Sequence, residues 1–171
     1  PAVGLLACKD VGAGKMPEPE TLLEYILREV AYEKDLKGKK ILVTAGPTQE
    51  PIDPVRYLTN HSSGKMGYAI AKVCSMRGAD VTLVSGKTAI KPPLFVDVVP
   101  VTTARDMYEA VTSRFDQQDI VIKAAAVADY RPKTISDQKV KKADGELSIE
   151  MERTDDILKY LGEHKREDQF L

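Results

Sequence analysis

One stretch of the chain combines a strand-like run with a loop rich in glycine and serine, and a helical pattern begins directly after that loop. Residues 40–46 (KILVTAG) read as the strand, the loop ends in residues 60–67 (NHSSGKMG), and Tyr68 continues the helix. Such a loop leaves backbone N–H groups without intrahelical partners, and the helix dipole adds positive potential there. It is a ready site for phosphate or another anion. We therefore expect a phosphorylated small molecule or a nucleotide as the ligand.

Strands and helices alternate from residue 39 onward. Runs rich in β-branched and apolar residues predict four strands, over residues 41–45, 80–85, 96–101 and 120–123. The helix after the anion loop runs to about residue 77, where Gly78 is a good C-terminal stop. Thr103 is the expected N-cap of a second helix over residues 104–115. This alternation predicts an α/β fold with a doubly wound, Rossmann-like, mostly parallel sheet.

In a sheet of this kind the ligand lies beyond the carboxyl ends of the strands, beside the switch point in strand order. The NHSSGKMG loop and residues 124–130 (AAAVADY) both follow strands at that edge. We expect these two segments to lie close together.

Residues 133–152 interrupt the alternation. The segments 139–142 and 146–151 flank Ala143-Asp144-Gly145, and apolar residues occupy every other position of the second segment. The Asp-Gly turn and this alternation predict a β-hairpin. We expect the hairpin to project from the sheet as a flap or a dimer arm. Thr154 is the expected cap of a last helix over residues 155–162.

The ends of the chain predict its domain limits. Residues 1–18 sustain neither a strand nor a helix pattern, whereas residues 20–34 place their apolar positions on one helical face. We therefore divide the chain into an N-terminal piece (1–18), a linker helix (19–39) and a main domain (40–171). A further strand is expected to begin at Phe170, so the main domain is expected to be incomplete at its C-terminal end.

The composition excludes several classes of protein. A formal net charge of −1 provides no global basic field, so nucleic acid is not an expected partner. The apolar runs fall far below the roughly 20 residues that span a bilayer, and the first residues do not form a signal peptide. Two cysteines, Cys8 and Cys74, are too few for a disulfide framework, which favours a cytoplasmic location.

Two long motifs carry a resemblance to a known family. Residues 41–67 (ILVTAGPTQEPIDPVRYLTNHSSGKMG) and 124–132 (AAAVADYRP) resemble the bacterial phosphopantothenoylcysteine synthetases. The resemblance covers about residues 40–160. In these proteins the synthetase is fused behind a flavin-dependent phosphopantothenoylcysteine decarboxylase. Residues 7–19 (ACKDVGAGKMPEP) resemble the last segment of that decarboxylase, so the chain resembles the junction between the two enzymes.

The resemblance implies a ligase that joins 4′-phosphopantothenate to cysteine. CTP is the implied co-substrate, an acyl-cytidylate the intermediate, and Mg²⁺ the ion that neutralises the triphosphate. FMN is implied only for the fused decarboxylase, and no residues of the sequence form a complete metal site. The resemblance also implies a homodimer, in which the arm of one subunit covers the site of its partner.

Particular residues match functional positions of the family. Asn60 matches the residue that hydrogen-bonds the carbonyl of the acyl-cytidylate, and Lys139 matches the flap lysine that neutralises triphosphate charge. Arg56, in the loop before Asn60, is a further candidate for a substrate contact. Cys8 matches the proton donor of the decarboxylase, which acts only in the intact protein. The implied nucleotide-binding residues are Gly46, Ser62, Ser63, Gly64, Lys123, Ala124, Ala125, Asp129, Lys139, Asp155, Asp156, Ile157 and Leu158.

Without the family, the same residues have simpler interpretations. Asn60 is a common turn residue, Asp129 can end a strand, and Lys139 belongs to a solvated hairpin face. Arg56 and Asp53 either bind substrate or brace their loop, and both interpretations stay open. Separately, His61 is expected to support the loop and Cys74 to pack in the core.

Two other functions fit part of the sequence. A nicotinamide-dependent oxidoreductase fits the α/β alternation, but no G-x-G-x-x-G follows the first strand. The second strand also ends in Val84-Ser85-Gly86, without an acidic residue for an adenosine ribose. A non-catalytic assembly module is the other alternative, because the hairpin fits a dimer arm.

Overall fold

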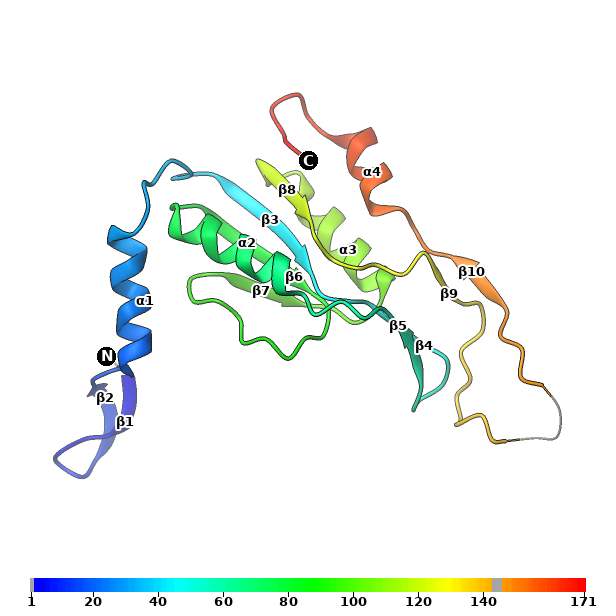
Figure 1. Cartoon of the computed structure of the whole chain (residues 1–171), viewed down its shortest axis with the longest axis horizontal. Coiled ribbons are helices and arrows are strands. Elements are labelled where there is room, and N and C mark those ends of the chain that lie inside the picture. The colour runs from blue at the N-terminus through cyan, green and yellow to red at the C-terminus, as the bar shows by residue number, and fades with distance from the viewer. Residues whose placement is uncertain (1, 143–145) are drawn as a thin grey trace.

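A four-stranded parallel sheet forms the centre of the molecule (Figure 1). The computed structural model describes residues 2–142 and 146–171. The strands lie in the order β7-β6-β3-β8, and every neighbouring pair is parallel. Their bounds are Asp97–Pro100 for β7, Asp80–Ser85 for β6, Lys40–Ala45 for β3 and Ile120–Lys123 for β8. All four predicted strands are confirmed, although the strand expected over residues 96–101 is shorter by one residue at each end.

Strand β3 is central, and it is buried from its second residue to its last. Such a continuous apolar run is what a parallel strand requires when both faces of its sheet are covered. Helix α2 (Lys65–Met76) covers one face, while α3 (Ala104–Phe115) and α4 (Ile157–His164) contribute to the core on the other. The expected doubly wound arrangement is therefore confirmed.

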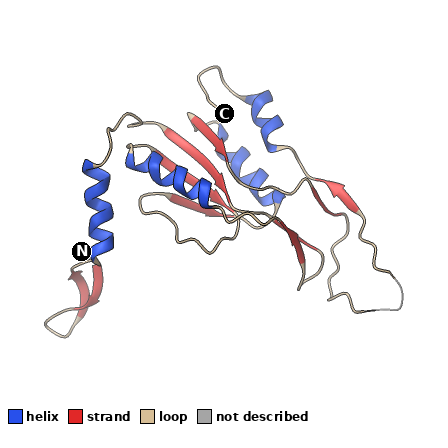
Figure 2. Cartoon of the chain, viewed as in Figure 1, coloured by secondary structure: helices blue, strands red, loops and turns tan. Residues whose placement is uncertain are grey.

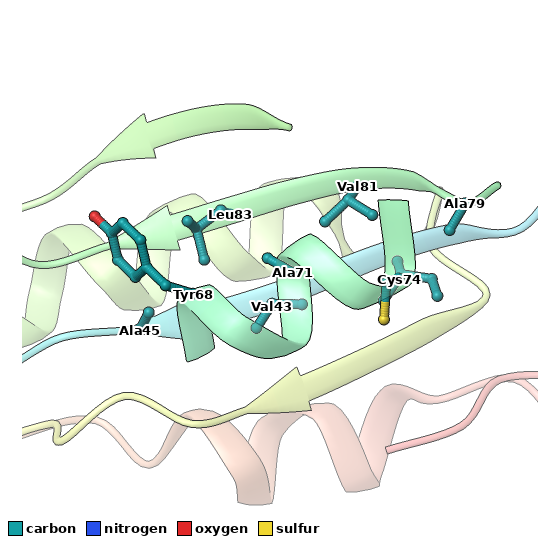
Figure 3. Close-up of a cluster of buried hydrophobic side chains, with 9 residues drawn as sticks. Val43, Ala45, Tyr68, Ala71, Cys74, Ala79, Val81 and Leu83 are labelled. Carbon is teal, nitrogen blue, oxygen red and sulfur yellow. The ribbon is translucent and has the colours of Figure 1, made fainter. Parts of the chain in front are cut away.

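The core under α2 illustrates this packing (Figure 3). Tyr68, Ala71 and Cys74 lie on one face of the helix and contact Val43 and Leu83 of the sheet. Cys74 is 7% exposed, which confirms its expected place in the core, and burial raises the pKa of its thiol.

Local sequence signals fix the helix ends. The Thr103 hydroxyl accepts a hydrogen bond from the Asp106 N–H, and the Asp106 side chain accepts one from the Thr103 N–H. This capping box starts α3 at the predicted residue. After α2, Gly78 adopts a φ of 93°, a left-handed conformation that suits glycine and ends the helix as expected.

Helix α1 (Pro19–Val30) packs beside α2 and is shorter than the predicted helix over residues 20–34. Tyr25 meets Phe95 edge to face with ring centroids 4.7 Å apart, and the Arg28 guanidinium lies 4.2 Å from the centre of the same ring. Lys72 of α2 forms an ion pair with Glu24 at 2.7 Å. The predicted extension to residue 34 was wrong: the helix ends with Ala31 as its C-cap, and the chain then turns so that the Leu36 N–H donates to the Arg77 carbonyl at 3.1 Å.

Two antiparallel pairs were not predicted. Strands β1 (Ala2–Leu5) and β2 (Val11–Lys15) form a hairpin within residues 2–15, a part of the chain expected to hold no regular element. Strands β4 (Gln49–Pro51) and β5 (Tyr57–Thr59) pair inside the loop that precedes α2. Strand β2 is glycine-rich, and β4 and β5 are only three residues long, so side-chain alternation gives little signal for either pair.

The hairpin predicted within residues 133–152 is present as a projecting antiparallel ribbon, but its paired strands lie only at the base of the ribbon. Strand β9 (Tyr130–Pro132) pairs with β10 (Met151–Arg153), whereas residues 139–142 and 146–150 form no strand (Figure 2). The predicted strand positions were therefore wrong. Their backbone has other partners: the Val140 N–H, for example, donates to Asp53. The predicted turn at 143–145 lies outside the described residues.

The last helix of the chain begins two residues later than predicted. Helix α4 begins at Ile157, and Asp156 rather than Thr154 caps it by accepting from the Lys159 N–H. The Thr154 hydroxyl donates to the Ala128 carbonyl instead. Phe170 forms a parallel bridge with Ile120 at the open edge of β8.

In the described residues, no helix has both the length and the apolar character that crossing a membrane would require.

We predict that Gly67→Ala destabilises the domain. A Cβ atom at Gly67 would lie 2.5 Å from the Cβ of Ala45 and 2.8 Å from the carbonyl oxygen of Thr44, so α2 would have to move away from β3. Overpacking of this kind costs about 1–3 kcal/mol of unfolding free energy, which urea denaturation measures. Gly162→Ala in α4 is the control: apart from its chain neighbours and the backbone of its own helix, no atom lies within 4 Å of the new Cβ, so we expect a gain of about 0.5–1 kcal/mol. Equal effects of both substitutions would contradict the close approach.

Candidate functional site

The loops that follow β3 and β8 are joined by backbone hydrogen bonds. Pro47 forms a parallel bridge with Ala126, the Ala126 N–H donates to the Gly46 carbonyl at 2.9 Å, and the Thr48 N–H donates to the Ala126 carbonyl at 3.1 Å. The Thr48 hydroxyl accepts from the Ala128 N–H at 3.0 Å. The two segments therefore continue the sheet beyond its regular strands. The expected proximity of the NHSSGKMG loop to residues 124–130 is confirmed by the hydrogen bond from the Asn60 side chain to the Ala126 carbonyl.

Thr44 joins the same two strands from inside the core. Its side chain is buried, and its hydroxyl accepts from the N–H groups of Ala124 and Ala125, both at 3.2 Å. These two residues were predicted to line the nucleotide site, and their amides point back toward β3. Thr44 was not singled out from the sequence, because a threonine at the end of a buried strand has no distinctive pattern.

The NHSSGKMG loop lies directly against this edge. Gly64 is the N-cap of α2 with a φ of 78°, and a Cβ atom on it would lie 3.2 Å from the Cα of Gly46. The hydroxyls of Ser62 and Ser63 accept long hydrogen bonds, of 3.3 and 3.5 Å, from the first amides of this turn. Gly64 has no side chain that could cap the helix. The structure thus brings Gly46, Ser62, Ser63 and Gly64 together at the positive end of α2.

Asn60 connects the loop to the segment after β8. Its side-chain N–H donates to the Ala126 carbonyl at 3.2 Å, and the residue is exposed. A carboxamide has two N–H donors, so one further donor is available to a ligand. Neighbouring His61 is also exposed.

A cavity of about 430 Å³ lies at the same edge, between the segment after β8 and the start of α4. Five residues predicted to bind nucleotide line it: Lys123, Asp129, Asp155, Asp156 and Ile157. Leu158, also predicted, is not among the lining residues and is exposed. Thr154 holds the two walls together, because its N–H donates to the Asp129 carbonyl at 3.0 Å and its hydroxyl to the Ala128 carbonyl at 2.6 Å.

The cavity combines cationic and anionic groups. Burial lowers the pKa of Lys123 below its usual range, and the nearby Asp156 carboxylate partly counteracts this effect. Arg153 also lines the cavity, and a hydrogen bond with Tyr130 raises the pKa of its guanidinium. Sequence reasoning missed Arg153, because a single arginine beside a turn is ordinary. The arrangement can bind a polar, phosphorylated ligand.

Arg56, Lys139 and Cys8 were also predicted as functional residues, and they are not among the residues that line this cavity. Arg56 donates to the Asp53 carboxylate and to the Val140 carbonyl, so the structure supports the bracing interpretation of its loop. Lys139 is exposed in the segment between β9 and the undescribed turn. Cys8 is exposed in the turn of the β1–β2 hairpin, at the opposite end of the molecule from the β9–β10 ribbon (Figure 1). Within residues 2–142 and 146–171, no group of three or more His, Cys, Asp or Glu side chains is arranged to hold a metal ion.

Comparison with known proteins assigns the family. The family described as "DNA/pantothenate metabolism flavoprotein C-terminal domain" matches residues 36–171. The chain belongs to this family. A relative from Bacillus subtilis, "Coenzyme A biosynthesis bifunctional protein CoaBC", is 50% identical over 170 residues, which are 98% of this chain and 42% of the relative. The protein of the same name from Escherichia coli K12 is 48% identical over 161 residues, or 92% of this chain and 40% of the relative.

Solved structures of the DNA/pantothenate metabolism flavoprotein family agree with this fold. The C-terminal domain of a CoaBC protein has a TM-score of 0.70 and 56% identity, covering 79% of this chain and 63% of that one. The DNA/pantothenate metabolism flavoprotein from Streptococcus pneumoniae has a TM-score of 0.66 and 27% identity, covering 74% and 65%. The chain spans about two fifths of the length of the curated relatives it matches.

We predict that Asp156→Asn lowers the pKa of Lys123 further. The substitution removes the carboxylate that favours the charged amine, while asparagine still caps α4. Nuclear magnetic resonance of the lysine side-chain amines, followed against pH, measures the change. Glu163→Gln, at the other end of α4, is the control and should leave the titration of Lys123 unaltered. An unchanged or raised pKa in Asp156→Asn would mean that the two groups do not interact.

Proposed function

We propose that this domain is the ligase that joins 4′-phosphopantothenate to cysteine in coenzyme A biosynthesis. Its relatives of about 50% identity are named as bifunctional proteins of that pathway. One structural observation carries the proposal: the NHSSGKMG loop, Asn60 and the segment after β8 share one edge of the sheet. That edge offers backbone donors and a helix N-terminus to a phosphorylated ligand.

The proposed reaction has two steps. The carboxylate of 4′-phosphopantothenate attacks the α-phosphate of CTP, which forms an acyl-cytidylate and releases pyrophosphate. The amine of cysteine then attacks the acyl carbon, loses a proton, and displaces CMP to leave an amide. Both steps move negative charge onto oxygen atoms, and preorganised donors accelerate such steps.

In this proposal the nucleotide occupies the cavity beside α4. Lys123 and Arg153 supply positive charge to phosphate oxygens, and Asp129, Asp155 and Asp156 are the available acceptors for base or sugar groups. The loop formed by Gly46, Ser62, Ser63 and Gly64 holds a phosphate through its amides and hydroxyls. Mg²⁺ is expected to arrive with the triphosphate, whose charge it neutralises.

Asn60 and Lys139 act at the reacting groups. The free N–H of the Asn60 carboxamide stabilises the oxygen of the acyl group as the amine attacks. Lys139 approaches from the exposed segment after β9 and neutralises the departing pyrophosphate.

The rest of the chain fits a bifunctional protein. We propose that residues 1–18 are the tail of a decarboxylase that uses FMN, with Cys8 as its proton donor, and that residues 19–39 join it to a ligase domain that starts at residue 40. The match to the Bacillus subtilis relative extends over 98% of this chain, whereas the family match begins at residue 36. A homodimer of the ligase domain and a cytoplasmic location complete the proposal.

We predict that Asn60→Asp accumulates the intermediate. The aspartate removes the N–H donor and adds a negative charge beside the developing oxyanion, which should slow the second step about 100-fold or more. The assay mixes Mg²⁺, CTP and 4′-phosphopantothenate, adds cysteine, and follows the acyl-cytidylate by mass spectrometry. It uses this chain and a chain extended to the full length of the relatives. If neither wild-type chain forms acyl-cytidylate, the proposed function is wrong.

We predict that Lys139→Ala slows the first step instead. Loss of one positive charge near the triphosphate should reduce acyl-cytidylate formation about 10-fold or more, because the charge of the leaving pyrophosphate is less well neutralised. Lys141→Ala is the matched control, since it removes a charge from the same segment and should leave the rate of this step unchanged. Equal losses in the two variants would indicate a general electrostatic effect.

A further inference from the structure

The side chain of Asp53 is fully buried and unusually well bonded. Its Oδ1 accepts from the N–H groups of Val55 at 2.9 Å and Arg56 at 2.8 Å. Its Oδ2 accepts from the Arg56 guanidinium at 2.6 and 3.1 Å, and from the Val140 N–H at 3.0 Å. Most of these bonds are local, but the last one reaches the segment that follows β9.

Arg56 completes the connection to that segment. Its guanidinium also donates to the Val140 carbonyl at 2.8 Å. The Asp53–Arg56 pair therefore bonds both backbone groups of one residue, in the way that a neighbouring strand would. One further tether lies close by, where the Ser136 N–H donates to the Ile52 carbonyl at 3.1 Å. These contacts hold residues 136–140 against the β4–β5 loop.

The pair stays charged under ordinary conditions. The Arg56 guanidinium, together with the backbone N–H groups, holds the pKa of the Asp53 carboxyl well below its usual range. The carboxylate is therefore ionised at neutral pH, and its hydrogen bonds are charge-assisted, which makes them roughly twice as strong as neutral ones.

Val140 follows Lys139 directly in the chain. A lysine side chain on an exposed segment samples many positions unless its backbone is fixed. We propose that Asp53 and Arg56 form a clamp on Val140 that positions Lys139 for the first step of the reaction. This inference rests on the proposed function, because that function gives Lys139 its role. Asp53 and Arg56 are positioning residues, and they act through the backbone of the segment.

Asp53→Asn opens the clamp with almost no change in volume. The asparagine carbonyl can still accept from Val55, but its NH₂ group then faces the donors of Arg56 and Val140. We expect trypsin to cleave after Lys139 at least 10-fold faster, and the Val140 amide to exchange with solvent faster. Glu50→Gln is the matched control, because Glu50 is also a buried carboxylate near this loop but bonds the Ala104 N–H. Cleavage and activity should be unchanged in that variant.

A double-mutant cycle tests whether the clamp acts through Lys139. In the wild-type background, Asp53→Asn should slow acyl-cytidylate formation about 10- to 100-fold, which is the loss expected when a reacting group is misplaced by about 1 Å. In the Lys139→Ala background, the same substitution should have little further effect, because the positioned group is already absent. The assay uses the chain extended to the length of the relatives.

Two results would overturn the proposal. One is an equal loss of rate from Asp53→Asn with and without Lys139, and the other is unchanged cleavage of the segment. If Asp53→Asn does not fold, Arg56→Lys keeps a positive charge beside Asp53 but removes the guanidinium that bonds both Asp53 and the Val140 carbonyl, and it takes the place of Asp53→Asn in the cycle and in the cleavage assay. If the wild type forms no acyl-cytidylate while its Val140 amide is protected, the proposed function fails. The clamp is then a structural contact only, without the positioning role.

Discussion

The close approach of α2 to β3 is the contact on which the rest of this domain depends. Gly67 brings the helix so near that a single added carbon would meet Ala45 at 2.5 Å. This close approach brings the start of the helix, and with it the NHSSGKMG loop, near Gly46. The glycine pair Gly46 and Gly64 can then lie against each other, with Thr88 beside them. A site for an anion at this edge follows from helix packing rather than from the loop alone.

Much of this architecture is present in the local sequence. Strands β6 and β8 and helix α3 have the predicted bounds, because β-branched runs and a Thr103 cap are strong local signals. The paired strands β1 and β2 escaped prediction, since glycine-rich segments pair through the backbone with little side-chain pattern. The helix over residues 20–34 was predicted too long, because the backbone after Ala31 turns and bonds the end of α2 through Leu36 and Arg77. Errors therefore arose where contacts distant in sequence decide the structure.

The candidate site was likewise predicted where local motifs form it and missed where contacts distant in sequence form it. The motifs predicted that Asn60 and the segment after β8 would meet, and the structure places the Asn60 side chain against Ala126. Thr44 was not singled out from the sequence and Thr154 was predicted only as a helix cap, although their hydroxyls join the segments that form the site. A single threonine has no pattern that separates it from others in a strand or turn. Its role depends on which backbone groups tertiary folding leaves within its reach.

Helix α1 fixes the orientation of the N-terminal hairpin relative to the main domain. It is fixed to the main domain by Glu24, Tyr25 and Arg28, so it is a rigid spacer rather than a flexible tether. Its 12 residues span about 18 Å, at 1.5 Å per residue, between the β1–β2 hairpin and the segment that leads into β3. A one-residue insertion in this helix would move the hairpin only about 1.5 Å, but it would turn the hairpin by about 100° around the helix axis. A change in the length of α1 therefore alters the direction in which the N-terminal hairpin faces much more than it alters the distance of the hairpin from the main domain.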